Sequence, residues 1–143
     1  MSVPAPIPTT EVVVTRTIAA SPTAVYDVWM DPACPGGPWF GAAQLIFEPG
    51  VDKLYFFAVD HEGRRWHHYG RFLRLDRGVV AAYTWMSEAT QGLESVVTVT
   101  FDGAGAGTQV TIRHAGVPDD EFGRQHGEGW TFILGSVAQR LEA

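Results

Sequence analysis

The stretch DDEFGRQHGEGWTFILGSVAQRL, residues 119–141, decides the fold. Its apolar residues recur every three or four positions, a spacing that places them on one stripe of an α-helix. The stripe consists of Trp130, Ile133, Leu134, Val137 and Leu141, and His126 precedes it by one turn. Asp119 or Asp120 is suited to cap the start of this helix, and Arg140 suits its negative end. We therefore predict one helix roughly 30–35 Å long, because each helical residue adds about 1.5 Å.

Glycines interrupt the interior of this helical stretch. Gly127, Gly129 and Gly135 each cost the helix stability, by about 1 kcal/mol relative to alanine. A helix retains such residues only where its packing or its function gains from a small side chain. The glycines therefore indicate a helix that packs closely against another element or that lines a binding site.

The composition describes a single domain. A chain of 143 residues with 45% hydrophobic residues is long enough to bury a core. Its formal charge of −6 argues against a nucleic-acid partner and against an anionic membrane surface. Cys34 is the only cysteine, and residues 1–10 do not resemble a signal peptide, so we expect a cytoplasmic protein. We expect residues 1–10 to be a flexible tail and residues 11–143 to form the domain.

Upstream of the helix, most of the chain alternates between apolar and polar residues in the manner of half-buried strands. Glu11–Ala19 is the first such segment. Ser21 and Pro22 then open a short helix that ends before Pro32, and a helical turn near Trp39 is a further option. Six more strands are predicted, at Ala43–Phe47, Lys53–Val59, Arg64–Leu75, Val79–Met86, Ser95–Phe101 and Thr108–His114. Short connections make these strands antiparallel neighbours.

These elements predict an α+β fold. A curved antiparallel sheet of six to seven strands would wrap around the long C-terminal helix, with one or two short helices after the first strand. This arrangement follows because the apolar face of each element must be buried against the other. Curved sheets of this kind leave a cavity beneath the helix, and an apolar cavity with a few polar groups is the usual place for a ligand.

The residues expected to face this cavity are mostly large rings. We predict a ligand site made of Trp29, Trp39, Phe56, Trp66, His68, Tyr83, Trp85, Val97, Ile112 and Trp130, with Arg16, His114 and His126 as polar anchors. For each ring the alternative is simple core packing. For Arg16 the alternative is a side chain whose stem packs while its head reaches water. For His114 and His126 the alternative is a pair of hydrogen-bonded histidines that fasten the helix to the sheet.

No motif of a known catalytic or metal centre is present. The segment Gly103–Gly107 joins two predicted strands, whereas a phosphate-binding loop must lead into a helix. His67 and His68 are adjacent on a strand and so point to opposite faces. No paired cysteines and no metal-binding histidine motif occur, so no metal site is predicted. Whether the protein is an enzyme is left open.

Several short segments resemble a known family. They are Ala20-Ser21-Pro22, Val25-Tyr26, Trp29, Tyr83-Thr84-Trp85, Ser95 to Val99, Gly107-Thr108, His114-Ala115-Gly116, His126 and Gly129-Trp130. Together they resemble the AHSA-type family, the activator of heat-shock protein 90 ATPase, within the START-like (SRPBCC) superfamily. The resemblance covers about residues 11–142. It implies the helix-grip (START-like, Bet v-type) fold with a deep cavity, no cofactor and no fixed reaction.

Three functions follow as hypotheses. The first is binding of a hydrophobic or aromatic small molecule in the cavity. The second is a cyclase-, aromatase- or hydrolase-like enzyme that acts on a polyketide- or lipid-like substrate with His126 or His114 as acid–base. The third is a co-chaperone-like interaction module. Because 143 residues leave no room for the separate N-terminal domain of the eukaryotic co-chaperones, we do not expect a chaperone partner. Whether the chain forms a homodimer is left open.

Overall fold

The computed structural model describes residues 6–143, so part of the predicted tail, residues 1–5, lies outside the described residues. The elements follow in the order β1 (Thr9–Ile18), α1 (Pro22–Met30), β2 (Gln44–Ile46), β3 (Leu54–His61), β4 (Arg64–Asp76), β5 (Val80–Ser87), η1 (Glu88–Thr90), β6 (Ser95–Ala104), β7 (Gly107–Pro118) and α2 (Glu121–Glu142). β1 begins two residues before the predicted strand. The amide of Asp119 also donates to the carbonyl oxygen of Pro8 at 2.8 Å, which ties this end of the chain down.

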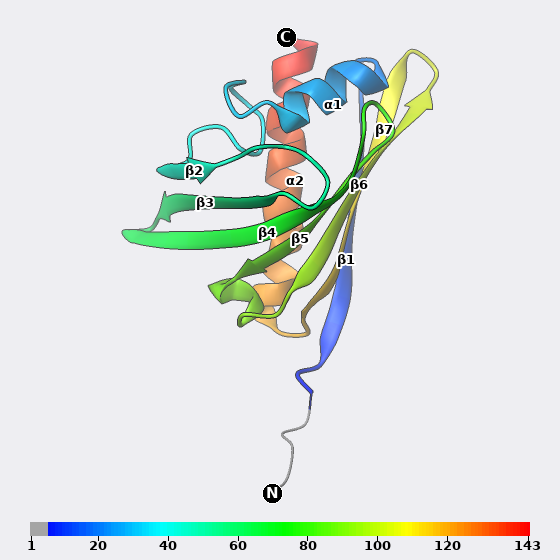
Figure 1. Ribbon diagram of the computed structural model, residues 1–143. Coiled ribbons are helices and arrows are strands. Elements are labelled where there is room, and N and C mark those ends of the chain that lie inside the picture. The colour runs from blue at the N-terminus through cyan, green and yellow to red at the C-terminus, as the bar shows by residue number, and fades with distance from the viewer. Residues whose placement is uncertain (1–5) are drawn as a thin grey trace, which may run out of the picture.

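The strands form one antiparallel sheet of seven strands. Their order across the sheet is β1-β7-β6-β5-β4-β3-β2, so only β1 lies away from its neighbours in the sequence. The sheet curves around α2, and α1 lies near the C-terminal end of α2 (Figure 1). The predicted α+β architecture is therefore confirmed: a curved antiparallel sheet around a long C-terminal helix, with one short helix after the first strand.

Local sequence signals set the ends of both helices. The hydroxyl of Ser21 accepts from the amide of Ala24 at 3.2 Å, and Pro22 occupies the first turn of α1. The carboxylate of Asp120 accepts from the amide of Gly123 at 2.8 Å and caps α2. Of the two aspartates suggested by the sequence, Asp120 is thus the cap. Each cap satisfies a backbone N–H that has no partner within the helix.

The connecting segments differ from prediction in three places. β2 pairs with β3 over only three residues, because its alternating segment lies at the edge of the sheet. The segment around Trp39 consists of turns, with no helix. The polar loop after β5 contains η1, which is capped by Ser87: its hydroxyl accepts from Ala89 at 3.1 Å, and its amide donates to Thr90 at 3.1 Å.

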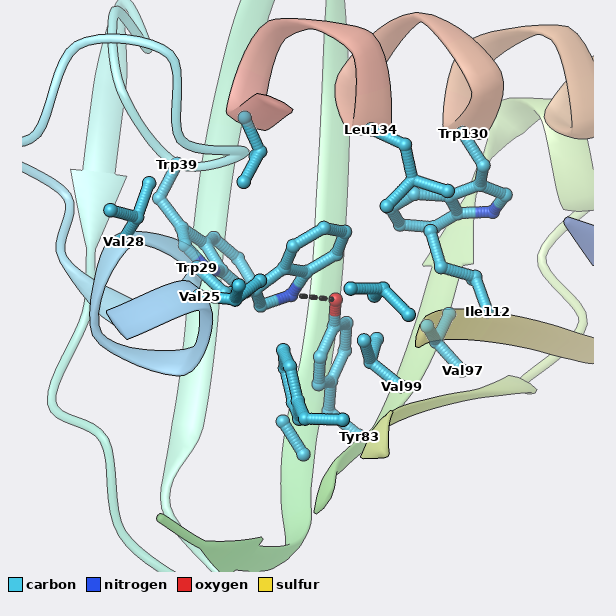
Figure 2. Packing of buried hydrophobic residues seen from close by; sticks show 14 of the residues in the cluster. Val25, Val28, Trp29, Trp39, Tyr83, Val97, Val99, Ile112, Trp130 and Leu134 are labelled. Carbon is cyan, nitrogen blue, oxygen red and sulfur yellow. Dashed lines mark hydrogen bonds between the residues drawn. The ribbon is translucent and has the colours of Figure 1, made fainter. Parts of the chain in front are cut away.

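The helix α2 lies against β1 and β7, at one side of the sheet. Trp130 and Leu134 point from α2 toward Val97 and Ile112 on the sheet below (Figure 2). At the α1 end, Trp29 is fully buried, and its indole N–H donates to the hydroxyl of Tyr83 at 3.3 Å (Figure 2). Here side chains fill the space under the helix completely. Over β3 to β5 the helix is farther away, and the space is only partly filled.

Candidate ligand-binding site

The larger of two hollows between α2 and strands β3 to β5 opens between the first half of the helix and the β3–β4 hairpin. Its volume is about 510 Å³, within the range of typical small-molecule sites. Its walls are His61, Glu62, Trp66, Trp85, Ala89, Phe122, Gln125, His126, Glu128, Gly129, Trp130 and Ile133. Strands β4 and β5 supply the rings on one side, and α2 supplies the opposite side.

A smaller hollow lies deeper in the protein. Its volume is about 210 Å³, and its walls are Pro38, Trp39, Phe57, Val59, His68, Tyr83, Trp85, Trp130 and Ile133. Trp85, Trp130 and Ile133 line both hollows, so the two lie on either side of these three side chains. Because rings form half of the larger hollow's walls and most of the smaller hollow's walls, the two hollows suit a flat apolar molecule.

His126 faces the larger hollow with one ring nitrogen already committed. Its Nδ1 lies 2.9 Å from the carbonyl oxygen of Phe122 and 3.2 Å from that of Gly123. Two acceptors at this nitrogen mean that Nδ1 carries the proton, so Nε2 of the neutral ring is an acceptor. Burial lowers the pKa of His126, against the smaller opposing effects of the two carbonyls and of Asp120. Nε2 hydrogen-bonds to no described residue.

His114, by contrast, is fully paired and fully buried. The indole N–H of Trp130 donates to its Nδ1 at 3.0 Å. Since Nδ1 is thereby an acceptor, Nε2 carries the proton and donates to the hydroxyl of Ser95 at 2.7 Å, and that hydroxyl donates to the carbonyl oxygen of Trp85 at 2.6 Å. Burial lowers the pKa of His114 to about 3, with a further contribution from His126. This chain fastens α2 to β5, β6 and β7.

His68 lines the deeper hollow. Its ring stacks on Phe57 with 4.3 Å between ring centroids and an angle of 7° between planes. Burial is the main cause that lowers the pKa of His68 to about 4. Its Nδ1 is buried without a hydrogen-bond partner among the described residues. A neutral, stacked imidazole of this kind adds a polar edge to an otherwise apolar wall.

Three indole nitrogens close to the hollows are unpaired. The indole N–H groups of Trp39, Trp66 and Trp85 are buried and have no hydrogen-bond partner within residues 6–143. A buried donor without a partner costs about 1–3 kcal/mol. All three tryptophans line one or both hollows through other atoms of their rings, because the nitrogens themselves are closed off.

The charges at the larger hollow are negative. Glu62 and Glu128 line it, and its walls contain no lysine or arginine. Arg64 packs against one wall residue: its guanidinium lies 4.1 Å from the centroid of the Trp66 ring. Arg64 is already paired with Glu88. The entrance therefore offers carboxylates but no free cation.

More than half of the predicted site residues come together at these hollows. They are Trp39, Trp66, His68, Tyr83, Trp85, His126 and Trp130. Trp29, Val97, Ile112 and His114 also face the inside, but they belong to the closely packed region of the core and line neither hollow. The reason is the position of α2, which rests on β1 and β7 and leaves space over β3 to β5.

Two predicted residues lie elsewhere. Phe56 is on the opposite face of β3, where its ring packs on Tyr69 with 5.0 Å between centroids. The segment around Phe56 is apolar on both faces, so its pattern did not indicate which face is inside. Arg16 is exposed, and its guanidinium lies beside Gly135 of α2, on the β1 side of the helix. This position matches a side chain whose head reaches water.

Some lining residues were not predicted. Phe57 and Val59 face inward because they pair with His68 and Trp66 across β3 and β4, and this register fixes the face of β3. The inward alternation of β4, which the sequence did indicate, would have identified them through that pairing. Phe122 lies one turn before His126 on the helical stripe, so the periodicity of the helix could have indicated it. Pro38 and the β3–β4 turn have no periodic signal, because they lie in irregular segments.

The described residues offer neither a cluster of metal ligands nor a membrane-spanning helix. No group of three or more His, Cys, Asp or Glu side chains in residues 6–143 is placed to hold a metal ion. In the same part of the chain, no helix has both the length and the apolar character needed to cross a membrane.

A curved sheet that encloses a long helix, with ring-lined hollows between them, defines a helix-grip protein. The family model described as Activator of Hsp90 ATPase homolog 1-like protein matches residues 19–142, and the chain belongs to this family. The predicted resemblance is thus confirmed. No curated protein matches the chain.

Solved structures share the fold at low sequence identity. Protein CV1439 from Chromobacterium violaceum is 22% identical, with a TM-score of 0.76 over 93% of this chain and 97% of that one. DynU16, from the dynemicin biosynthetic locus, is 21% identical, with a TM-score of 0.75 over 93% of this chain and 47% of that one. The Aha1 dimer from Colwellia psychrerythraea is 16% identical, with a TM-score of 0.70 over 93% of this chain and 96% of that one.

Proposed function

We propose that this protein binds an aromatic or otherwise apolar small molecule between α2 and strands β3 to β5. The observation that carries the proposal is the pair of hollows that share Trp85, Trp130 and Ile133 and whose walls are rich in aromatic rings. An apolar ligand would fill this space. Nε2 of His126, which has no partner among the described residues, would pair with one polar atom of that ligand.

The apolar walls account for affinity, and the polar atoms account for orientation. Burying ring surface contributes about 25 cal/mol per Å² before the costs of association are subtracted. Nε2 of His126, the ring nitrogen without a partner, then selects one orientation of the bound molecule. This combination of a large apolar area with few polar contacts is typical of small-molecule sites.

The first test is native mass spectrometry of freshly purified protein, followed by calorimetric screening of aromatic and fatty compounds. The variant Ile133→Trp tests the location, because Ile133 lines both hollows and a larger side chain there would fill them. We expect this variant to fold and to lose most of its affinity for any ligand found. Phe132→Ala is the matched control, because Phe132 is 77% exposed on the same helix. Unchanged binding by Ile133→Trp would place the ligand elsewhere.

A second candidate function is acid–base catalysis on the bound molecule. One observation favours it: backbone carbonyls hold Nδ1 of His126, so that Nε2 is a base of fixed orientation at the larger hollow. The substrate would be polyketide- or lipid-like, and DynU16, a protein of a biosynthetic locus with the same fold, makes such compounds reasonable ones to test. Turnover that survives His126→Gln would remove this candidate.

A co-chaperone role is a third hypothesis, and only the family name supports it. It predicts that the isolated chain stimulates the ATPase of heat-shock protein 90. We expect no stimulation, because the features described above lie under α2 and not on an outer docking surface. Saturable stimulation by the isolated chain would reverse that expectation.

A further inference from the structure

Most of the α2 residues that line the larger hollow form one stripe of the helix, with a glycine near its centre. The stripe consists of Phe122, Gln125, His126, Gly129, Trp130 and Ile133. Because these residues recur at intervals of three and four positions, they share one face of the helix. Gly129 is the member of this stripe without a side chain, and it lies between the turn of His126 and the turn of Ile133.

No neighbouring atom requires a glycine at position 129. A Cβ at Gly127 would lie 3.1 Å from Cγ1 of Val12, so the close approach of α2 to β1 accounts for the glycine there. A Cβ at Gly129 would meet no atom within 4 Å. Glycine in a helix interior costs stability, and packing does not explain why Gly129 is kept. Its position at the larger hollow does offer an explanation.

A side chain at position 129 would take up space in the hollow. Helical side chains lean toward the N-terminus of their helix, so this side chain would extend over the turn that carries Gln125 and His126. Both residues line the same hollow, and Nε2 of His126 has no partner among the described residues. With glycine at this position, the backbone of α2 itself forms this part of the wall. A flat ring can then lie against it.

We propose, on the basis of the binding function proposed above, that Gly129 determines which ligands the larger hollow accepts. The missing side chain leaves room for a fused aromatic system of two or more rings between the backbone of α2 and the rings of Trp66 and Trp85. A single ring is narrower and depends less on this space. Gly129 thus selects broad, flat aromatic compounds over single-ring compounds.

The test adds side chains of increasing size and measures two ligands of different breadth. Gly129→Ala and Gly129→Leu are compared with the unaltered protein by isothermal titration calorimetry with phenol and 2-naphthol, and the melting temperature of each is recorded. We expect Gly129→Ala to weaken 2-naphthol binding roughly tenfold, since one added carbon in a binding pocket has effects of this order. We expect a smaller loss for phenol, and no measurable 2-naphthol binding by Gly129→Leu.

Gly135→Ala is the matched control, because it makes the same substitution in the same helix away from both hollows. A Cβ at Gly135 would lie 3.7 Å from a guanidinium nitrogen of Arg16, an ordinary contact distance. Both alanine variants should raise the melting temperature, since alanine is the better helix former. Only Gly129→Ala should weaken 2-naphthol binding. A structural role for Gly129 would instead lower stability and affinity together.

The alanine variant decides the matter even if Gly129→Leu fails to fold. Unchanged 2-naphthol affinity in Gly129→Ala overturns this inference and leaves the binding function standing. Equal losses for phenol and 2-naphthol, or an equal loss in Gly135→Ala, overturn it in the same way. Failure of the unaltered protein to bind either compound overturns the inference together with the proposed function.

Discussion

Trp130 acts at two levels in this protein. Its ring is only 3% exposed and stacks near Trp29 and Trp85, while its indole N–H donates to His114. It therefore joins the helix to the sheet and also separates the two hollows. His114, its partner, is held neutral by burial and by a hydrogen bond at each ring nitrogen. The structure favours the fastening role for His114, whereas His126 retains a free nitrogen at the site.

Replacing Trp130 tests how strongly it attaches α2 to the sheet. Trp130→Ala should lower the free energy of unfolding by about 3–5 kcal/mol, the usual cost of removing a large buried ring. Trp130→Phe should cost less, but still about 1–3 kcal/mol, because Nδ1 of His114 loses its donor. Urea denaturation measures both, with the exposed Phe132→Ala as control. A loss below about 1 kcal/mol for Trp130→Ala would show that the ring is not a core residue.

The buried histidines make stability depend on pH. His68 and His114 have folded-state pKa values lowered to about 4 and about 3, mainly by burial. In the unfolded chain these imidazoles bind protons below pH about 6.5. Between this pH and the lowered pKa values, the unfolded state therefore binds more protons than the folded state does. Their contribution to stability is full above pH about 7 and is lost as the pH falls, by up to about 1.4 kcal/mol per pH unit for each.

Urea denaturation between pH 7 and 5 measures this dependence, in a range where carboxylates contribute little. His114→Leu should reduce the slope of stability against pH, whatever its effect on stability at pH 7. His61→Asn is the control, because the side chain of His61 is largely exposed. A stability that stays level or rises as the pH falls from 7 to 5 would contradict neutral, buried histidines.

At the scale of elements, two glycines of α2, Gly123 and Gly129, differ in the space around them. A Cβ at Gly123 would collide with the carbonyl oxygen of Pro118, because the chain turns tightly from β7 into the helix. A Cβ at Gly129 would meet nothing within 4 Å. The first glycine is needed for packing, and the second stands in open space at the larger hollow.

The same substitution should therefore have opposite effects at the two positions. Gly123→Ala should destabilise the protein by about 1–3 kcal/mol or more, as a forced contact does. Gly129→Ala should stabilise it by up to about 1 kcal/mol, because alanine is the better helix former. Thermal and urea denaturation of the two variants provide the comparison. Equal effects of the two substitutions would mean that the start of α2 is placed differently.

The elements were more predictable from the sequence than the site was. The long helix, its capping aspartate at Asp119 or Asp120 and the alternation of β4 to β7 follow from local patterns that also satisfy burial. The site depends on where α2 rests across the sheet, and no local pattern carries that information. Val97 and Ile112 alternate inward as predicted, yet α2 covers them directly, while the equally inward Trp85 borders open space. The predicted inward position of Phe56 was wrong for a simpler reason: both faces of β3 are apolar, so the pattern does not indicate which face is inside.

At the scale of the whole molecule, the position of α2 explains both stability and binding. The helix is anchored to β1 and β7 on one side, so the curved sheet stands away from it on the other. Rings from β3, β4 and β5 fill part of that space and leave two hollows. A protein selected for packing alone would close this gap with larger side chains. The gap is therefore the feature on which the proposed function depends.

The most direct measurement is an amide and indole NMR titration of ¹⁵N-labelled protein with 2-naphthol. The protein has five tryptophans, and their indole N–H signals can be assigned by single Trp→Phe variants. We predict saturable shifts that are largest for Trp66 and Trp85, whose rings line the larger hollow. The signal of Trp29, which is bonded to Tyr83, should move least. Absence of any saturable shift, or shifts as large at Trp29 as at Trp85, would contradict a ligand site under α2.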